Sequence, residues 1–405
     1  MIMGKSITIG LMALWLSSCA IEPKYGLVIQ NVGLFDGEKD QGVVNIAINA
    51  DIIAAISKER LLSDSLVDAK GKYMIPGLVN SHVHMWMEEH LKEAYRTGIL
   101  ANMGMHASDP SRDRALKALG EREGYPYYYS SGIGATVPGG HPTFITPGIE
   151  TINDSVSIRQ FVDNRILEGV DHIKIIREST PWFEQPQGPP TLPFDSIAKI
   201  IAYAHSKGLK AVVHIGALEE MVQIAKLKPD GIVHMWHSSL DADLTQDRLR
   251  QIKESGAFVV PTALVNQRAL MLAREQGEAF AKFAGENFLP MEKIKKSIGQ
   301  LHDAGVTILA GTDNGNYDLN WGDDLIEELI IYSDSGMNNV EVLKTATGNP
   351  AKAWNIPVGS LHVGSKASML LLNGNPLDDL EHLRDIHTIW KNGAVSTKDS
   401  QINAL

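Results

Sequence analysis

The chain has 405 residues, of which 44% are hydrophobic and 21% are charged, a composition typical of a globular protein. At this length we expect one large domain and a smaller one. The formal net charge is −11, and the acidic excess is spread along the chain. Nucleic acid is therefore not expected as a partner, because a phosphate backbone requires a basic surface.

The first residues of the chain differ in composition from the rest. After Lys5 the stretch SITIGLMALWLSSCA (6–20) carries no charge, and it is too short to span a bilayer, which needs about 20 apolar residues. This pattern predicts a signal peptide over residues 1–18. The letters LSSC (16–19) resemble a bacterial lipobox, which implies lipidation of Cys19; an ordinary export signal is the alternative.

The lipobox resemblance also predicts where the protein resides. Ala20 follows Cys19, which favours sorting to the outer membrane of a two-membrane bacterium. The expected location is outside the cytoplasm, on the periplasmic or surface face, with the lipid anchor as the only membrane contact. Cys19 is the only cysteine of the chain, so no disulfide within the chain is expected.

Short β-strands are predicted at both ends of the chain, where apolar and polar residues alternate. The predicted strands are 25–35, 42–50, 52–57, 367–380 and 386–395. Asn392-Gly393 is a strong signal for a hairpin turn. We therefore predict one small β-sandwich that combines residues 25–76 with residues 357–396.

The middle of the chain, residues 77–356, alternates amphipathic helices with apolar strands. A helix is predicted over 193–208, ends at Gly208 and precedes an apolar strand, and the same order recurs twice further along. Candidate strands lie near 78–85, 97–103, 126–131, 170–176, 210–216, 231–236, 257–262 and 306–312. This pattern predicts an α/β fold, a (β/α)₈ TIM barrel. A doubly wound open sheet is the alternative, but no glycine-rich phosphate loop follows the first strand.

Two histidines stand one residue apart in GLVNSHVHMW (77–86). Residues i and i+2 of a strand share a face, so His82 and His84 are predicted to point into the barrel together as half of a metal site. A pair of hydrogen-bonded core histidines is the alternative. Polar residues also end four later apolar runs: Lys174, His214, His234 and Asp313. Because the carboxyl ends of barrel strands meet at one mouth, all six side chains are predicted to converge there.

In this combination the sequence resembles the amidohydrolase superfamily. The resemblance rests on HVH after PGLVNS, a lysine on the fourth strand, histidines on the fifth and sixth, an aspartate on the eighth, and the split β-sandwich. Within the superfamily the chain is most similar to the branch that groups imidazolonepropionase-like hydrolases with bacterial prolidase-like dipeptidases. The resemblance covers residues 25–396.

The resemblance implies two divalent metal ions. Their ligands would be His82, His84 and Asp313 for one ion, and His214 and His234 for the other. Lys174, carboxylated by carbon dioxide, would bridge the two; an ordinary lysine paired with an acid is the alternative. Zinc suits these ligands, as do manganese, cobalt and iron. The ions would share a hydroxide that attacks the scissile carbonyl, and Asp313 would pass its proton to the leaving group.

Three further residues are candidates for contact with the substrate. His141 lies in VPGGHPT (137–143) and is a candidate catalytic residue, in contact with a substrate carbonyl or carboxylate. Arg177 and His237 are candidates for substrate binding, the arginine through a carboxylate. Each also has a purely structural alternative, as a packing, surface or capping residue. The proline-rich run over 177–193 is a candidate lid.

One departure from the resemblance helps to choose a branch. One-metal deaminases of the superfamily usually carry an acid a few residues after the fifth-strand histidine. Here the first acids after His214 are Glu219 and Glu220, in the next predicted helix. This favours a two-metal hydrolase. The second strand region, residues 95–109, also departs from the relatives, so the substrate is not carried over from them.

The sequence therefore predicts an exported, two-metal hydrolase that cleaves the amide bonds of peptides or N-acyl amino acids. The expected partner is a small-molecule substrate, and a homo-oligomer is left open. Alternatives on the same barrel are a one-metal deaminase or cyclic amidase, and a lactone or phosphotriester hydrolase. The alternative outside the enzymes is a ligand-binding surface lipoprotein.

Overall fold

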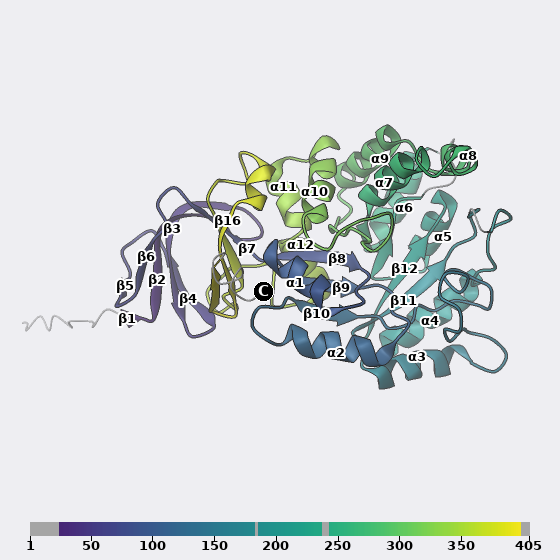
Figure 1. The fold of residues 1–405 in the computed structure, drawn as a ribbon, viewed down its shortest axis with the longest axis horizontal. Helices are drawn as coiled ribbons and strands as arrows, with labels where there is room; N and C mark the ends of the chain where they lie inside the picture. The colour runs from purple at the N-terminus through teal and green to yellow at the C-terminus, as the bar shows by residue number, and fades with distance from the viewer. Residues whose placement is uncertain (1–23, 183–184, 237–242, 398–405) are drawn as a thin grey trace, which may run out of the picture.

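The computed structural model describes residues 24–182, 185–236 and 243–397. Figure 1 shows an elongated molecule with a β-sheet unit at one end and a larger α/β unit at the other. No helix within these ranges is long and apolar enough to cross a membrane. The predicted signal peptide, residues 1–18, and Cys19 lie outside the described residues.

The β-sheet unit combines strands from the two ends of the chain. Its strands are β2 (Leu27–Phe35), β3 (Asp40–Asn49), β4 (Ile52–Ser57), β6 (Leu66–Asp68), β7 (Tyr73–Pro76), β15 (Met369–Leu372), β16 (Ile386–Lys391) and β17 (Ala394–Thr397). They form one eight-stranded sheet in the order β17-β16-β15-β7-β2-β3-β4, with β6 paired to β2. The short strands β1 (Lys24–Tyr25) and β5 (Leu62–Ser63) pair with each other.

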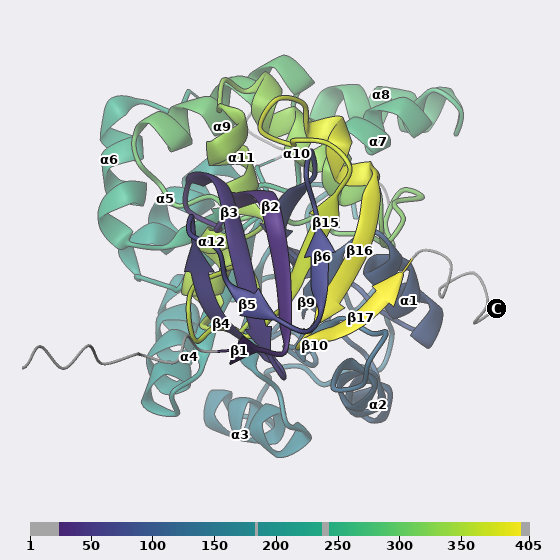
Figure 2. The same cartoon turned by 90° about the vertical axis from the view of Figure 1, so that its left-hand side faces the viewer.

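The two chain ends meet where β15 pairs antiparallel with β7, with Leu370 opposite Ile75. Figure 2 shows the purple and yellow strands side by side in front of the α/β unit. Asn392 (φ 52°) and Gly393 (φ 79°) form the β16–β17 turn, which confirms the predicted hairpin. The arrangement of these strands as a sandwich stays a prediction.

The α/β unit contains two parallel sheets. The first is β8 (Leu78–Val83), β9 (Ile99–Gly104) and β10 (Tyr127–Ser130), and the second is β11 (His172–Arg177), β12 (Lys210–Ile215), β13 (Gly231–Val233) and β14 (Phe258–Val260). Isolated bridges join Ala135 to Ile175 and Val259 to Ile308, and a third joins Val83 to Asn314. The strands thus curl into a barrel-like arrangement, but they do not form one closed eight-stranded sheet.

The missing strand is the eighth predicted one, over 306–312. This segment is hydrogen-bonded on both sides, through Leu309 N–H to Val259 and Ser81 N–H to Ala310, yet it forms no regular ladder. Asp313 follows it with a left-handed backbone (φ 55°), which an extended strand does not allow. The prediction of eight regular strands is therefore corrected to seven in the described ranges, with the eighth segment held by single bridges.

Helices cover the outside of the curled strands (Figure 1). They are α1 (Glu88–Arg96), α2 (Pro110–Gly120), α3 (Ile158–Glu168), α4 (Phe194–Ser206), α5 (Leu218–Lys226), α6 (Gln246–Ser255), α7 (Ala263–Ala273), α8 (Glu278–Asn287), α9 (Met291–Asp303), α10 (Asp324–Asp334), α11 (Asn339–Thr345) and α12 (Gly348–Trp354), with a 3₁₀ turn η1 (Leu380–Arg384). In α4 the buried residues Ile197, Ile200, Ile201 and Ala204 recur at helical spacing. The carboxyl ends of the parallel strands point away from the β-sheet unit, and polar side chains gather at that end.

Candidate active site

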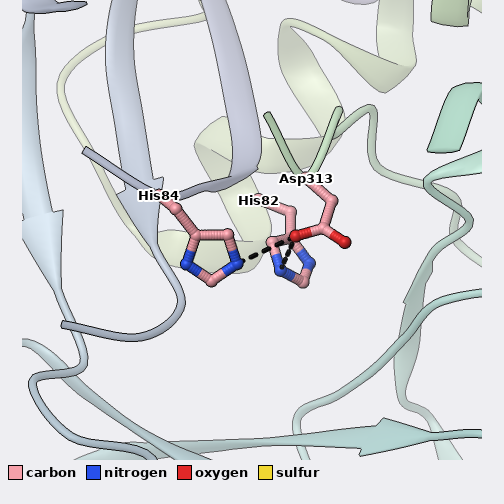
Figure 3. A group of neighbouring side chains, drawn as sticks. All are labelled: His82, His84 and Asp313. Atoms are coloured by element: carbon pink, nitrogen blue, oxygen red, sulfur yellow. Dashed lines mark ion pairs between the residues drawn. The ribbon is translucent and has the colours of Figure 1, made fainter. Parts of the chain in front are cut away.

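His82, His84 and Asp313 form one cluster at the end of β8 (Figure 3). The Nε2 atoms of His82 and His84 lie 3.2 and 2.8 Å from Oδ1 of Asp313. Asp313 is 7% exposed and reaches this position from a left-handed backbone conformation, which is costly for a residue other than glycine. Within the described ranges this is the one group of three histidine, cysteine or acidic residues close enough to hold a metal ion together.

The protonation states in this cluster suit a metal site. Burial lowers the pKa of His82 to about 3, so its imidazole is neutral at pH 7. Burial alone would raise the pKa of Asp313, but His82 and His84 lower it well below the usual value, so this carboxyl is ionised. Metal ions bind neutral imidazole and ionised carboxylate, and the cluster offers both.

The second predicted group lies beside the first. The ring of His234 is 4.7 Å from that of His82 and 4.4 Å from that of His214. Lys174 of β11 is only 3% exposed, and burial lowers the pKa of its amine to about 7. Like Asp313, His234 has a left-handed backbone (φ 77°). All six predicted ligands line one cavity.

A neighbouring carbonyl fixes which nitrogen of His84 faces the cluster. Nδ1 of His84 lies 3.3 Å from the carbonyl oxygen of His106, and because a carbonyl only accepts, Nδ1 carries the proton. Nδ1 of His234 lies 2.9 Å from the hydroxyl of Thr262. Such outer partners orient metal-binding imidazoles in proteins. This leaves Nε2 of His84 for a metal ion, whereas Nδ1 of His234 lies 3.9 Å from Oδ2 of Asp313.

His214 has a carboxylate partner that sequence reasoning missed. Oε2 of Glu178 lies 3.0 Å from Nε2 of His214, and Glu178 is fully buried. Glu178 follows β11, whereas His214 lies in β12, so the acid reaches the histidine from the neighbouring strand. The sequence argument against a one-metal deaminase was that no acid closely follows His214. In space this argument does not hold, because the carboxylate of Glu178 lies beside the ring.

The six residues fit a pair of divalent ions by the chemistry of their donors. Imidazole nitrogens and carboxylate oxygens, without a thiolate, suit zinc, manganese, cobalt or iron. A buried ammonium would repel a cation, but the lowered pKa of Lys174 makes the neutral amine available at neutral pH. A neutral amine can react with carbon dioxide to give an anionic carbamate with two oxygen ligands.

The cavity around these residues has a volume of about 530 Å³ and walls rich in aromatic side chains. The aromatic residues of the walls are Trp86, Trp182, Phe280, Phe283, Phe288 and Tyr317. Phe280 and Phe283 lie on α8, which follows α7 in an excursion after β14. No motif in the sequence marked α8 as part of a site, because its apolar residues are equally typical of a packed helix face.

Of the residues predicted to contact the substrate, His141 lines the cavity. Its ring is stacked at 4.6 Å on Trp182 and lies 5.2 Å from the ring of His214. Burial lowers the pKa of His141 well below its usual value. Pro181 and Trp182, from the predicted lid over 177–193, also line the cavity. His237 lies outside the described residues.

Arg177 is not among the described residues that line the cavity. Its Nε lies 2.8 Å from Oε1 of Glu220, and its Nη1 donates a hydrogen bond to the carbonyl of Leu192 at 2.7 Å. The guanidinium also lies 4.4 Å over the ring of Phe194. These contacts support the structural alternative for Arg177 and give no support to a substrate carboxylate contact.

His106 is a second residue that sequence reasoning missed. It follows β9, lines the cavity, and accepts a hydrogen bond at Nδ1 from the backbone N–H of Gly134 at 3.1 Å. Burial lowers the pKa of His106 to about 3, so the ring is neutral. Its place at the end of an apolar strand was the available signal, the same signal that identified His214 and His234.

Comparison with known proteins identifies the family. The sequence model of the amidohydrolase family matches residues 73–397. The chain is 22% identical over 432 residues to the 5-methylthioadenosine/S-adenosylhomocysteine deaminase of Thermoanaerobacter pseudethanolicus, a match that covers 94% of this chain and 91% of that protein. Prolidases are among the similar solved structures.

Two of these structures share the fold over nearly their whole length. A Xaa-Pro dipeptidase with bound methionine has a TM-score of 0.79 at 21% identity, covering 92% of this chain and 99% of that one. A putative prolidase from Bifidobacterium longum has a TM-score of 0.77 at 20% identity, covering 94% and 98%. The family match over most of the chain shows that the protein belongs to the amidohydrolase family, and with the deaminase relatives it identifies a metal-dependent hydrolase acting on C–N bonds.

Proposed function

We propose that the protein is a two-metal hydrolase that cleaves an amide bond in small peptides or N-acyl amino acids. The observation that carries the proposal is the buried Lys174 amine, which lines one cavity with the four histidines and Asp313. Burying a charged amine is costly. A carbamate on Lys174 would remove the positive charge and provide a ligand that bridges the two ions. A one-metal site has no comparable use for this lysine.

The residues of the cavity take distinct roles in this proposal. His82, His84 and Asp313 would hold one ion, and His214 and His234 would hold the other. When bound, the ions would supply a Lewis acid for the scissile carbonyl and lower the pKa of the attacking water. Asp313, ionised by its two histidine neighbours, accepts the proton of that water and delivers it to the leaving nitrogen.

His141 contributes to substrate binding rather than to metal binding. Its ring is neutral at pH 7 because burial lowers its pKa, and it lies on the cavity wall next to His214. A neutral imidazole donates a hydrogen bond from one nitrogen, and we assign that donor to the acyl oxygen of the substrate. This assignment makes His141 an orienting group for the scissile carbonyl.

The walls of the cavity support substrates with apolar side chains. Aromatic rings line the same cavity as the metal ligands, and Phe280, Phe283 and Phe288 all come from α8 or the residue that follows it. Rings of this kind bury apolar groups well and add contacts with flat ones. We therefore expect peptides or N-acyl amino acids with a bulky apolar group to be better substrates than charged ones.

We also propose that the protein is exported and held at the outer membrane by a lipid on Cys19. The support is the sequence pattern alone, because residues 1–23 lie outside the described ranges. Substitution Cys19→Ala should move the protein from the membrane fraction to the soluble fraction of the producing bacterium. A wild-type protein that already fractionates as soluble would contradict the anchor.

A one-metal deaminase is the second candidate. Two observations favour it: the carboxylate of Glu178 lies beside His214, and the curated relatives include a 5-methylthioadenosine/S-adenosylhomocysteine deaminase and a 5'-deoxyadenosine deaminase. Glu178 is not among the described cavity-lining residues, however, so the ring of His214 separates it from a substrate. Under this candidate Lys174 would remain an unmodified amine.

Metal content and substrate screening distinguish these candidates. The form that starts after Cys19 would be purified with bicarbonate and without chelator, and the ions per chain counted by mass spectrometry. Two ions, with turnover of apolar dipeptides or N-acyl amino acids, support the proposal. One ion with release of ammonia from an adenosine analogue supports the deaminase. Turnover of a lactone or phosphotriester, without turnover of any amide, would replace the amide hydrolase with a hydrolase of that substrate. Absence of bound ions after reconstitution would favour a ligand-binding lipoprotein.

A further inference from the structure

Glu178 is held in one position by the chain around it. Its Oε1 accepts a hydrogen bond from the backbone N–H of Thr180 at 2.8 Å and another from the Thr180 hydroxyl. Its own backbone N–H donates to the hydroxyl of Thr191 at 3.1 Å. With Oε1 held in this way, Oε2 faces Nε2 of His214 at 3.0 Å.

The neighbouring strand leaves room for this carboxylate. In the β11–β12 register Ile176 pairs with His214, so Glu178, two residues on, lies over Gly216. A Cβ atom at Gly216 would lie 2.1 Å from Oε1 of Glu178, so a larger residue at 216 would require the carboxylate to move. Glycine at 216 therefore leaves the space that the Glu178 carboxylate occupies beside His214.

We propose that Glu178 is a positioning residue that accepts a hydrogen bond from Nε2 of His214 and so presents Nδ1 of that ring to the metal. The proposal rests on the proposed metal site. A carboxylate oxygen only accepts, so Nε2, the nitrogen of His214 that faces Oε2 of Glu178, is the donor of this hydrogen bond. His214 would then bind through Nδ1, whereas His84, whose Nδ1 faces the carbonyl of His106, would bind through Nε2.

This geometry separates Glu178 from the reaction itself. Glu178 is fully buried and does not line the cavity, so its influence on chemistry passes through His214. Outer partners of this kind change metal affinity by about 10–100-fold in metal sites generally. The effect is expected at the ion held by His214 and not at the ion held by His82, His84 and Asp313.

The first test measures cobalt(II) affinity against a competing chelator in three variants. Glu178→Met removes the acceptor and should weaken one of the two binding events by about 10–100-fold. Glu178→Gln keeps an acceptor oxygen without the charge and should recover part of that loss. Glu220→Met is the matched control, because Glu220 is also buried and bonds the same loop at Gly216 N–H (3.1 Å) without contact to His214. Thermal unfolding verifies that each variant is folded.

Two results of this test would overturn the proposal. Affinity within twofold of wild type in Glu178→Met would show that His214 needs no positioning. Equal losses in Glu178→Met and Glu220→Met would assign the effect to packing of the loop. A wild-type protein that binds a single ion would instead refute the two-metal function, and the second test then decides the role of Glu178.

The second test needs no metal. ¹⁵N spectra of histidine-labelled, metal-free protein identify the protonated nitrogen of His214, with the signal assigned by its loss in His214→Asn. We expect proton on Nε2 in the wild type and a mixture of tautomers in Glu178→Met. A wild-type ring protonated at Nδ1, or an unchanged tautomer in the variant, would overturn the proposal whatever the number of ions.

Discussion

Lys174 gives a quantitative prediction for the metal-free protein, because its amine is buried at a measurable cost. The side chain is 3% exposed, and burial lowers its pKa from 10.5 to about 7. At about 1.36 kcal/mol for each pH unit, this difference corresponds to about 5 kcal/mol of stability. The substitution Lys174→Met, which keeps a long unbranched side chain and removes the charge, should recover most of it.

The sign of the pH dependence follows from the two pKa values. Below pH 7 the Lys174 amine is charged in both the folded and the unfolded protein. The folded protein is then destabilised by the full free energy of burying that charge. Between pH 7 and 10.5 the unfolded chain holds a proton that the folded chain has released, so wild-type stability rises with pH. We therefore expect Lys174→Met to be more stable than wild type at pH 7, with a gap that narrows by about 2 kcal/mol at pH 9.

Urea unfolding of both proteins at pH 7 and pH 9 measures this gap. Chelator and carbon-dioxide-free buffer keep the metal ions and the carbamate away from Lys174. Lys199→Met, at an exposed lysine of α4, controls for the loss of one positive charge from the chain. A gap between wild type and Lys174→Met that does not change with pH would refute the reasoning. So would a less stable Lys174→Met that remains less stable at both pH values.

Three further predictions concern activity and packing. Asp313→Asn should lower kcat by about 10²–10⁴-fold with an unchanged circular dichroism spectrum, because it removes the proton acceptor; activity within a few-fold of wild type would contradict that role. Gly216→Ala should lower the free energy of unfolding by about 1–3 kcal/mol, since its Cβ would overlap Glu178, and a thermal melt unchanged from wild type would disprove the close contact. Arg177→Met should cost on the order of 3 kcal/mol in urea unfolding by leaving Glu220 without its charge partner, while KM stays unchanged; a large rise in KM would restore the substrate role of Arg177.

Much of the site was predictable because its signals are local. The spacing of His82 and His84 places both on one face of β8, and the ends of apolar runs identified Lys174, His214 and His234. Parallel strands bring their carboxyl ends to one edge, so residues far apart in sequence meet without further information. The hairpin at Asn392-Gly393 was predictable for the same reason, since the left-handed backbone of both residues is a local preference.

Other parts depended on the register between strands, which no short stretch of sequence contains. Glu178 meets His214 only because β11 and β12 pair with Ile176 opposite His214. Arg177, one residue earlier, points to the other side of the strand, and its charge is taken by Glu220. Adjacent residues of a strand point to opposite faces. A shift of one residue along the strand therefore moves a side chain from the metal site to the outer layer of helices.

The sequence by itself thus determined the family resemblance, the alternation of strands and helices, and the six residues that meet at the cavity. The tertiary structure alone decided which nitrogen of His84 faces the cluster, which acid lies beside His214, and which rings of α8 line the cavity. It also showed that the segment before Asp313 is held by single bridges rather than by a regular ladder. The physical reason is the same in each case: local preferences fix the elements, whereas contacts between elements depend on register, burial and the space left by neighbours such as Gly216.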